Sequence, residues 1–309
     1  MSTKLTTIDA KKTFKINSDF TIQAFEKKTD LVPQIDPNYI FDQDLTNAIL
    51  AGITFNKKAL IHGLHGCGKS THIEQVAARL NWGVIRINFD SNITRLELVG
   101  RDVIKIKDHK QITEFKEGIL PFAIQKPIIL ILDEYDAISP EIAFVMQRLL
   151  EDDSQFVLFE ENKIIKANKY FRIFATANTI GFGDDMGIYH GTNLINQASL
   201  DRFNIIANFD YLSEDIEVKI LVKKTKIDPK TAKLMVGLAN LTRYGFKNND
   251  ISTLISLRTL ISWSLNYQIF KSIEASFILT FFNRVLDDEK PIIAEYFQRI
   301  FALNLHEKN

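Results

Sequence analysis

The stretch "HGLHGCGKSTH" at residues 62–72 decides the fold of this chain. Its first part, 63–70, matches the pattern G-x-x-x-x-G-K-[ST] of a phosphate-binding loop. The apolar run "KKALIHG" (57–63) predicts a buried strand before the loop, and "KSTHIEQVAARL" (69–80) predicts a helix after it. Glycines allow backbone N–H groups to turn inward around an anion, while the lysine reaches the phosphates and the hydroxyl reaches Mg²⁺. The sequence therefore predicts a nucleotide site.

The same stretch contains three of the six histidines and the only cysteine, a combination that also occurs at transition-metal sites. Electrostatics disfavours a metal site, because a helix N-terminus carries about half a positive charge and Lys69 adds a full one. We therefore expect His62 to end a strand, His65 to flank the nucleotide and His72 to lie on the first helical turn. Cys67 is expected to be a small loop residue whose position favours alkylation.

Two acids follow the apolar run "PIILILDE" (127–134), which predicts a central parallel strand. Asp133 is expected to hold Mg²⁺ together with Ser70, and Glu134 to orient and polarise the attacking water. Asn178, at the end of "FATAN", either faces the γ-phosphate from an adjacent strand or is an ordinary turn residue. ATP and Mg²⁺ are the expected cofactors. The residues expected to contact the nucleotide are consecutive: Gly63, Leu64, His65, Gly66, Cys67, Gly68, Lys69, Ser70 and Thr71.

Two arginines are further candidates for catalysis. Arg202, in "SLDRF", is expected on a short helix before the last strand. A single arginine there is commonly a surface charge, but in an oligomeric ATPase it would reach the nucleotide of a neighbouring copy and stabilise the transition state. Arg258, in "SLRTLISW", opens a predicted helix and would contact the γ-phosphate of its own chain. This contact would couple the helical region to the nucleotide state.

Strands alternate with helices up to about residue 212, after which only helical patterns remain. This order predicts an α/β fold, a P-loop αβα nucleotide-binding domain with β-hairpin insertions followed by an all-α lid domain. The expected domains are an N-terminal arm at 1–40, the ATPase domain at 41–212 and the lid at 213–309.

The expected elements rest on apolar periodicity. Strands are expected at 57–63, 83–89, 127–134, 170–178 and 204–210. Helices are expected at 43–55, 69–80, 139–152, 213–225, 229–244, 256–270, 273–286 and 289–305. Hairpins are expected at 99–115, with Asp108, His109 and Lys110 near the tip, and at 156–171, turning around Glu161 and Asn162. The aromatic-rich helices after residue 256 are expected to form packed core.

The composition limits the class of protein. Lys plus Arg and Asp plus Glu both number 38, so the formal net charge is zero, without the basic excess typical of a nucleic-acid binder. The N-terminus lacks the apolar run of a signal peptide, and no stretch reaches about 18 apolar residues. A single cysteine fits a reducing compartment. We expect a soluble, cytoplasmic protein without nucleic-acid or membrane partners.

The order of these motifs resembles that of the AAA+ ATPases, and the hairpin at 99–115 is similar to an insertion of MoxR-type and chelatase ATPases. A closer resemblance, along nearly the whole chain, is to the ATPase subunits of aerobic cobaltochelatase, the CobS type. It is carried by "THIEQVAARLNW" (71–82) and "YHGTNLINQA" (189–198), which are not general ATPase motifs. Cys67 departs from the small hydroxyl residue usual in that family, and Leu257 from the proline before the lid arginine.

The resemblance implies an ATP-hydrolysing motor subunit that drives Co²⁺ insertion into hydrogenobyrinic acid a,c-diamide, in aerobic cobalamin biosynthesis. It further implies a hexameric homo-oligomeric ring and two partners, a large subunit that holds corrin and cobalt and a coupling subunit with an integrin-like domain. The chelation site would then lie outside this chain. The alternatives are a MoxR-type remodelling chaperone acting on a protein client, a magnesium-chelatase motor, a DNA-directed motor and a non-hydrolysing scaffold. The scaffold is disfavoured by the joint presence of Lys69, Asp133 and Glu134.

Overall fold

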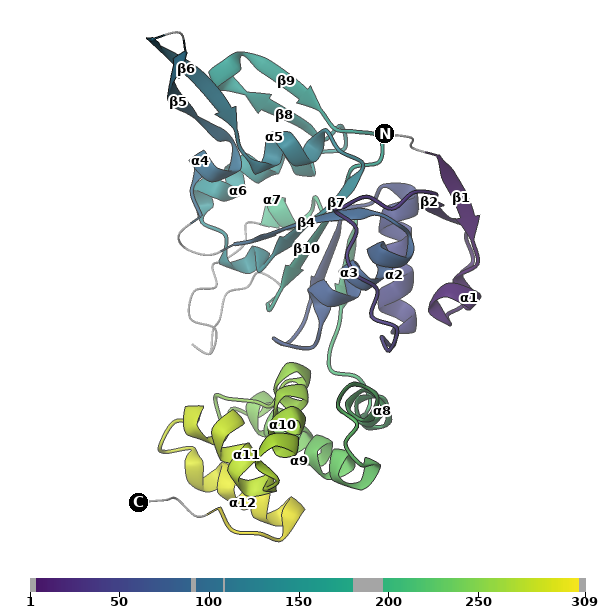
Figure 1. Cartoon of the computed structure of the whole chain (residues 1–309), viewed down its shortest axis with the longest axis vertical. Coiled ribbons are helices and arrows are strands. Elements are labelled where there is room, and N and C mark those ends of the chain that lie inside the picture. Colours follow the sequence, from purple (N-terminus) through teal and green to yellow (C-terminus); the bar gives the residue numbers. More distant parts are fainter. Residues whose placement is uncertain (1–3, 90–92, 108, 180–196, 306–309) are drawn as a thin grey trace. The chain divides into compact units, whose positions relative to one another are not determined.

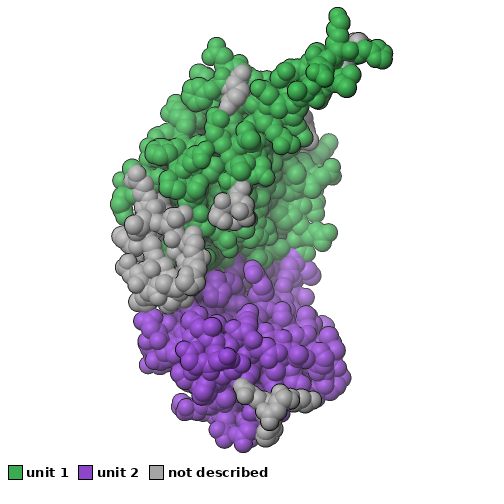
Figure 2. All heavy atoms as spheres, turned by 90° about the vertical axis from the view of Figure 1, so that its left-hand side faces the viewer, with its two compact units in different colours: residues 1–35, 41–63, 69–209 green, residues 36–40, 64–68, 210–309 purple. Residues whose placement is uncertain are grey.

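The computed structural model describes residues 4–89, 93–107, 109–179 and 197–305. The expected hairpin tip at Asp108 and most of the motif at 189–198 lie outside the described residues. The chain divides into two compact units, coloured green and purple in Figure 2. Unit 1 comprises residues 1–35, 41–63 and 69–209, and unit 2 comprises residues 36–40, 64–68 and 210–309.

A five-stranded parallel sheet, in the order β11-β3-β10-β7-β4, forms the centre of unit 1. The strands are β3 (Ala59–His62), β4 (Gly83–Asn88), β7 (Ile128–Asp133), β10 (Arg172–Ala177) and β11 (Ile205–Asn208). All five lie in the predicted stretches, which confirms the parallel-sheet prediction. Every residue of β7 is buried, as expected of a central strand with both faces covered.

Helices cover both faces of the sheet (Figure 1). On one side lie α2 (Gln43–Phe55) and α3 (Lys69–Arg79), and on the other lie α5 (Ile119–Ile124) and α6 (Pro140–Gln147). Because side chains alternate along a strand, Leu130 and Leu132 of β7 share one core cluster with Leu120 of α5 and Met146 of α6. Ser139 caps α6 by accepting a hydrogen bond from the Ile142 N–H at 3.4 Å.

Both predicted hairpins are present in unit 1. The first pairs β5 (Gly100–Lys107) with β6 (Lys110–Glu117), and the second pairs β8 (Gln155–Leu158) with β9 (Lys163–Lys166). The sequence did not predict the antiparallel pair β1 (Leu5–Ile8) and β2 (Ile22–Phe25), the intervening α1 (Ala10–Phe14), or the short helix α4 (Arg95–Leu98). These elements are four or five residues long, which is too short for apolar periodicity to be recognised. The short helix expected before the last strand is present as α7 (Gln197–Leu200), but it ends two residues before Arg202.

Unit 2 is helical after residue 210. Its helices are α8 (Glu214–Thr225), α9 (Pro229–Lys247), α10 (Leu257–Phe270), α11 (Ile273–Thr280) and α12 (Lys290–Phe301). Trp263, Phe277 and Phe297 are fully buried at its centre, which confirms that the aromatic-rich stretches form core. The last two helices end earlier than predicted, and a 3-10 turn at Phe282–Arg284 follows α11. Among the described residues, no helix combines the length and apolar character needed to cross a membrane.

Candidate nucleotide-binding site

The polar groups of the predicted site lie at the carboxyl ends of neighbouring strands. Gly63 follows β3, Asp133 ends β7, and Asn178 follows β10, which lies between these two strands in the sheet. Because the strands are parallel, these three ends share one edge, the usual place for ligands in an open α/β sheet. The structure therefore brings together residues as far apart in the sequence as Gly63 and Asn178.

Lys69, the first residue of α3, points its ammonium group at this edge. Its Nζ donates to the carbonyl oxygen of Gly63 at 2.6 Å and to Oδ1 of Asn178 at 3.1 Å. The lysine is 7% exposed, so little of its side chain remains in contact with water. Lys69 and Asn178 are thus adjacent, as expected if both contact the same phosphate.

Asp133 is 4% exposed and forms the polar centre of the site. Its Oδ1 accepts hydrogen bonds from the hydroxyls of Ser70 and Thr176, and its Oδ2 accepts from Arg86, with the Arg86 Nε at 2.8 Å. Ser70 and Asp133, which are both expected to hold Mg²⁺, are thus in direct contact. Arg86 and Thr176 could not be recognised from the sequence, because their roles depend on β4 and β10 flanking β7 on its two sides.

Glu134 has a left-handed backbone with φ of 56°, which is uncommon for a residue with a side chain. Its N–H donates to the Thr176 hydroxyl at 3.3 Å, and its side chain is exposed. Although the side chain is exposed, partial desolvation by the surrounding protein raises the pKa of the Glu134 carboxyl above its usual 4.5, and the charges of Asp133 and Asp136 raise it further. A carboxylate with a raised pKa is a stronger base, as a group that polarises water requires.

Asp136 positions the segment that carries Asn178. Asp136 is fully buried, and its Oδ2 accepts hydrogen bonds from the N–H groups of Asn178 and Thr179, both at 2.9 Å. These two bonds fix the backbone from which the Asn178 amide reaches Lys69. A signal was present in the sequence, since Asp136 follows the acidic pair by only two residues, but its partners depend on the adjacent strand.

His72 lies on the first turn of α3, as predicted, and is 1% exposed. Its Nε2 is 2.8 Å from the hydroxyl of Thr46, and its ring contacts Phe41 and Phe209 edge-on, with centroids 5.5 and 5.6 Å away. Burial lowers the pKa of His72 to about 3, so the ring is neutral in the folded protein. His72 therefore packs α3 against α2 as an uncharged group.

Two other residues of the histidine–cysteine stretch differ in exposure, since His62 is half-buried and Cys67 is buried. His62 ends β3 as predicted, and burial, assisted by the charge of Lys69, lowers its pKa. Cys67 is only 3% exposed, so the expectation that its position favours alkylation is wrong. Within the described part of the chain, no group of three or more His, Cys, Asp or Glu side chains is arranged to hold a metal ion.

Residues 64–68 of the loop belong to unit 2 and contact its helical residues. The Tyr211 hydroxyl donates to the carbonyl of His65 at 2.6 Å, and a Cβ on Gly66 would come within 2.6 Å of the Ser256 Cβ. Gly66 has φ of 71°, so both its conformation and the nearby Ser256 favour glycine there.

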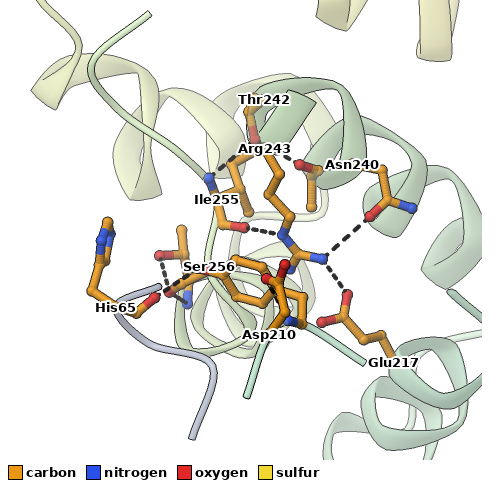
Figure 3. Close-up of polar contacts among 11 residues, drawn as sticks. His65, Asp210, Glu217, Asn240, Thr242, Arg243, Ile255 and Ser256 are labelled. Atoms are coloured by element: carbon orange, nitrogen blue, oxygen red, sulfur yellow. Dashed lines mark hydrogen bonds and ion pairs between the residues drawn. The ribbon is translucent and has the colours of Figure 1, made fainter. Parts of the chain in front are cut away.

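Arg243 packs against the ring of Tyr211, the residue whose hydroxyl contacts His65. Its guanidinium lies 3.7 Å from the centre of the Tyr211 ring and donates to the carbonyl of Ile255 at 3.0 Å and to Glu217 at 2.8 Å (Figure 3). Both Arg243 and Glu217 are buried. Burial raises the pKa of Glu217, and the charge of Arg243 opposes that shift. Arg258 is exposed in the first turn of α10, in the same unit.

Arg202 lies apart from the other predicted catalytic residues of unit 1. It follows α7, and three residues later the Ile205 N–H donates to the carbonyl of Lys58, just before β3. Lys58 and Gly63 flank β3 at opposite ends, and five residues of extended strand span roughly 16 Å. Arg202 is therefore at the amino edge of the sheet, whereas Lys69 binds at the carboxyl edge.

Two family descriptions match this chain. The AAA domain (dynein-related subfamily) matches residues 58–203, and the CbbQ/NirQ/NorQ C-terminal region matches residues 217–294. Aerobic cobaltochelatase subunit CobS of Sinorhizobium sp is 46% identical over 307 residues, covering 98% of this chain and 92% of that protein. Protein CbbQ of Hydrogenophilus thermoluteolus is 25% identical over 202 residues, covering 65% of this chain and 71% of that protein. A mutant RuvB structure from Thermotoga maritima has a TM-score of 0.50 at 13% identity, covering 86% and 73% of the two chains, and is similar in fold alone.

Proposed function

This chain belongs to the family of the aerobic cobaltochelatase subunit CobS and has the AAA+ P-loop fold, and on this premise we propose that it is the ATP-hydrolysing motor subunit of a cobaltochelatase. The complex would act as a ligase that forms nitrogen–metal bonds, inserting Co²⁺ into hydrogenobyrinic acid a,c-diamide for cobalamin biosynthesis. The observation that carries this proposal is 46% identity along 98% of the chain. The arrangement of Lys69, Ser70 and Asp133 supports the ATPase part.

In the proposed mechanism, Lys69 holds the β- and γ-phosphates, and the backbone N–H groups of the loop cradle them. To bind the phosphates, the Lys69 ammonium gives up its hydrogen bond to the Gly63 carbonyl or to the Asn178 amide oxygen. Because Asn178 lies beside Lys69, it is also within reach of the γ-phosphate. Glu134 accepts a hydrogen bond from the attacking water and aligns it. Asp136 maintains the position of Asn178 throughout.

The residues at this edge fit a bound Mg²⁺. Mg²⁺ prefers hard oxygen ligands, and the Ser70 hydroxyl and the Asp133 carboxylate already lie in contact. When bound, the ion would neutralise charge on the phosphates. Ser70 would ligate directly, and Asp133 would hold the ion's water, while Arg86 keeps the carboxylate oriented through Oδ2.

We also propose a homo-oligomeric ring, hexameric by the family resemblance, in which Arg202 acts on the nucleotide of the neighbouring copy. The location of Arg202 at the opposite edge of the sheet from Lys69 supports action on another chain. Arg258 would contact the γ-phosphate of its own chain and report nucleotide state to the lid at 213–309. The partners would be the corrin- and cobalt-binding large subunit and the coupling subunit with an integrin-like domain, in the cytoplasm.

The second candidate is a MoxR-type remodelling chaperone with a different protein client. The match of residues 217–294 to the CbbQ/NirQ/NorQ C-terminal region favours it, as does 25% identity to Denitrification regulatory protein NirQ of Stutzerimonas stutzeri. Both candidates share the same ATPase chemistry, so nucleotide assays alone do not separate them.

Reconstitution separates the two candidates. The chain is purified with its two proposed partner subunits, and ATP-dependent Co²⁺ insertion into the corrin is followed by visible absorbance. We expect insertion only when all three proteins are present. A folded chain that hydrolyses ATP but supports no insertion beside competent partners would exclude the chelatase role and favour the chaperone.

A further inference from the structure

The candidate transition-state arginine, Arg202, is held by an ion pair inside its own chain. Its Nε and Nη2 both donate to Oε1 of Glu151, at 2.9 and 2.8 Å, and its Nη1 donates to the carbonyl of Ala198. We propose that Glu151 is a positioning residue, which orients the guanidinium of Arg202 toward the nucleotide of a neighbouring copy. This inference rests on the proposed action of Arg202 across chains.

These three contacts fix the orientation of the Arg202 guanidinium and leave some of its N–H donors for an acceptor outside the chain. A guanidinium carries five N–H donors in one plane, so three internal bonds leave two donors for an external acceptor. The Arg202 side chain also keeps 26% of its surface exposed. Two donors on one rigid planar group suit the two oxygens of a phosphate, which arginine commonly binds in bidentate fashion.

Glu151 is itself held on a rigid part of unit 1. It follows the 3-10 turn Arg148–Leu150, in which Leu149 and Leu150 are buried in the core. The carbonyl of Glu151 also accepts a hydrogen bond from the Ser154 N–H at 3.0 Å. The backbone of Glu151 is therefore fixed, and its side chain, which keeps 40% of its surface exposed, is held by the ion pair with Arg202.

Arg202 is anchored on its other side by its neighbour in the sequence. Phe203 is 5% exposed, and its ring packs edge-on against Tyr135, with centroids 5.4 Å apart. Tyr135 directly follows Glu134. The backbone of Arg202 and the partner of its guanidinium are thus both fixed, and an arginine oriented before the phosphate arrives loses less entropy on binding it.

The charge-removing variant Glu151→Gln tests this role. It retains the size of the side chain, but it replaces a charge-assisted pair by neutral hydrogen bonds. We expect kcat of the assembled ATPase to fall about tenfold, with KM for ATP unchanged. A misoriented Arg202 would lose part of its stabilisation of the transition state without affecting ATP binding. Glu151→Asp should behave similarly, because its shorter carboxylate cannot reach both nitrogens.

A matched control lies on the same turn. Asp153 pairs with Arg148 at 2.8 Å, whereas the hydrogen bonds of Arg202 within the described residues go to Glu151 and Ala198. Asp153→Asn removes an ion pair of the same type from the same segment, and we expect its kcat to equal that of the unchanged protein. An equal loss in both variants would mean that the turn, rather than the orientation of Arg202, sets the rate, and would overturn the proposal.

Mixing two variants tests whether the effect crosses between chains. Glu134→Gln copies lack their own hydrolysis but retain the Arg202–Glu151 pair, whereas Glu151→Gln copies retain an intact phosphate site. We expect the activity per Glu151→Gln chain to rise when Glu134→Gln copies are added, because their arginines serve the neighbouring sites. No rise on mixing would overturn the proposal, because it would mean that Glu151→Gln impairs hydrolysis only within its own chain.

Arg202→Ala separates this inference from the proposed function. If Arg202→Ala abolishes hydrolysis while Glu151→Gln leaves kcat unchanged, the positioning role fails and action of Arg202 across chains stands. If Arg202→Ala hydrolyses ATP at the full rate, both the role of Arg202 and the role of Glu151 fail, and the phosphate site is unaffected. Loss in both variants, with recovery on mixing, is the result that the proposal requires.

Discussion

Mildly acidic pH should destabilise unit 1 through His72. Burial lowers the pKa of this histidine from 6.5 to about 3, and its Nε2 is 2.8 Å from the Thr46 hydroxyl. The folded protein therefore keeps the ring neutral, while the unfolded chain takes up a proton below about pH 6.5. Because the unfolded state binds more protons, the free energy of unfolding falls as the pH decreases from 6.5 toward 3.

The size of this effect follows from the pKa difference. Each pH unit within the window is worth about 1.4 kcal/mol. Lowering the pH from about 7.5 to about 5 spans roughly one and a half units of that window and removes about 2 kcal/mol. This loss is a large fraction of the free energy of unfolding of an ordinary protein, which is about 5 to 15 kcal/mol.

The comparison uses His72→Gln, which cannot take up a proton at this position. Both chains also carry Trp263→Phe, so that Trp82 is the remaining tryptophan of two and reports unfolding of unit 1. Urea unfolding followed by fluorescence at about pH 7.5 and about pH 5 gives the two free energies. Carboxylates titrate equally in both chains and cancel in the difference.

We expect the difference in free energy of unfolding between the two chains to shift by about 2 kcal/mol in favour of His72→Gln on acidification. A difference that stays constant within about 0.5 kcal/mol would refute the neutral, buried state of His72 and its packing between α2 and α3.

Three other changes have predictable directions. Gly63→Ala should lower the free energy of unfolding by at least about 3 kcal/mol, because φ is 150° and a Cβ would overlap the carbonyl oxygen of Phe209. Gly237→Ala, in α9, is the control in thermal unfolding, because its Cβ would make only an ordinary van der Waals contact. Arg243→Met should destabilise by about 3 to 5 kcal/mol because it leaves Glu217 charged and buried, and adding Glu217→Leu should restore much of the loss in urea titrations. The acidic limb of the kcat–pH profile should lie above the ordinary glutamate pKa of 4.5, because Glu134 must be ionised and its pKa is raised; a limb at or below 4.5 would argue against Glu134 as the water-orienting base.

The parallel sheet and half of the site were predictable because they depend on local patterns. Continuous apolar runs identify strands such as β7, and residues at strand ends must meet at one edge once the strands are parallel. The loop and acidic motifs placed Lys69, Ser70 and Asp133 at one nucleotide site but left Asn178 open, and the structure brings all four together.

The remaining contacts depend on which strands are neighbours, and apolar periodicity carries no information about strand order. Arg86 reaches Asp133 only because β4 lies beside β7. Asp136 binds the backbone of Asn178 because β10 lies on the other side. The Arg202–Glu151 pair joins residues 51 positions apart. Arg202 was recognisable in "SLDRF", whereas Glu151 belongs to no motif that the sequence singles out.

The central claim is that ATP turnover at the loop of residues 63–70 drives cobalt insertion by the complex. The most direct test is the rate of Co²⁺ insertion into the corrin by the reconstituted three-protein complex, measured with the unchanged chain and with Lys69→Ala. Lys69→Ala removes the ammonium group that lies between Gly63 and Asn178. We predict a loss of insertion by at least about a hundredfold, with assembly of the complex retained on size-exclusion chromatography. Insertion at the unchanged rate with Lys69→Ala would contradict the account and reduce this chain to a scaffold.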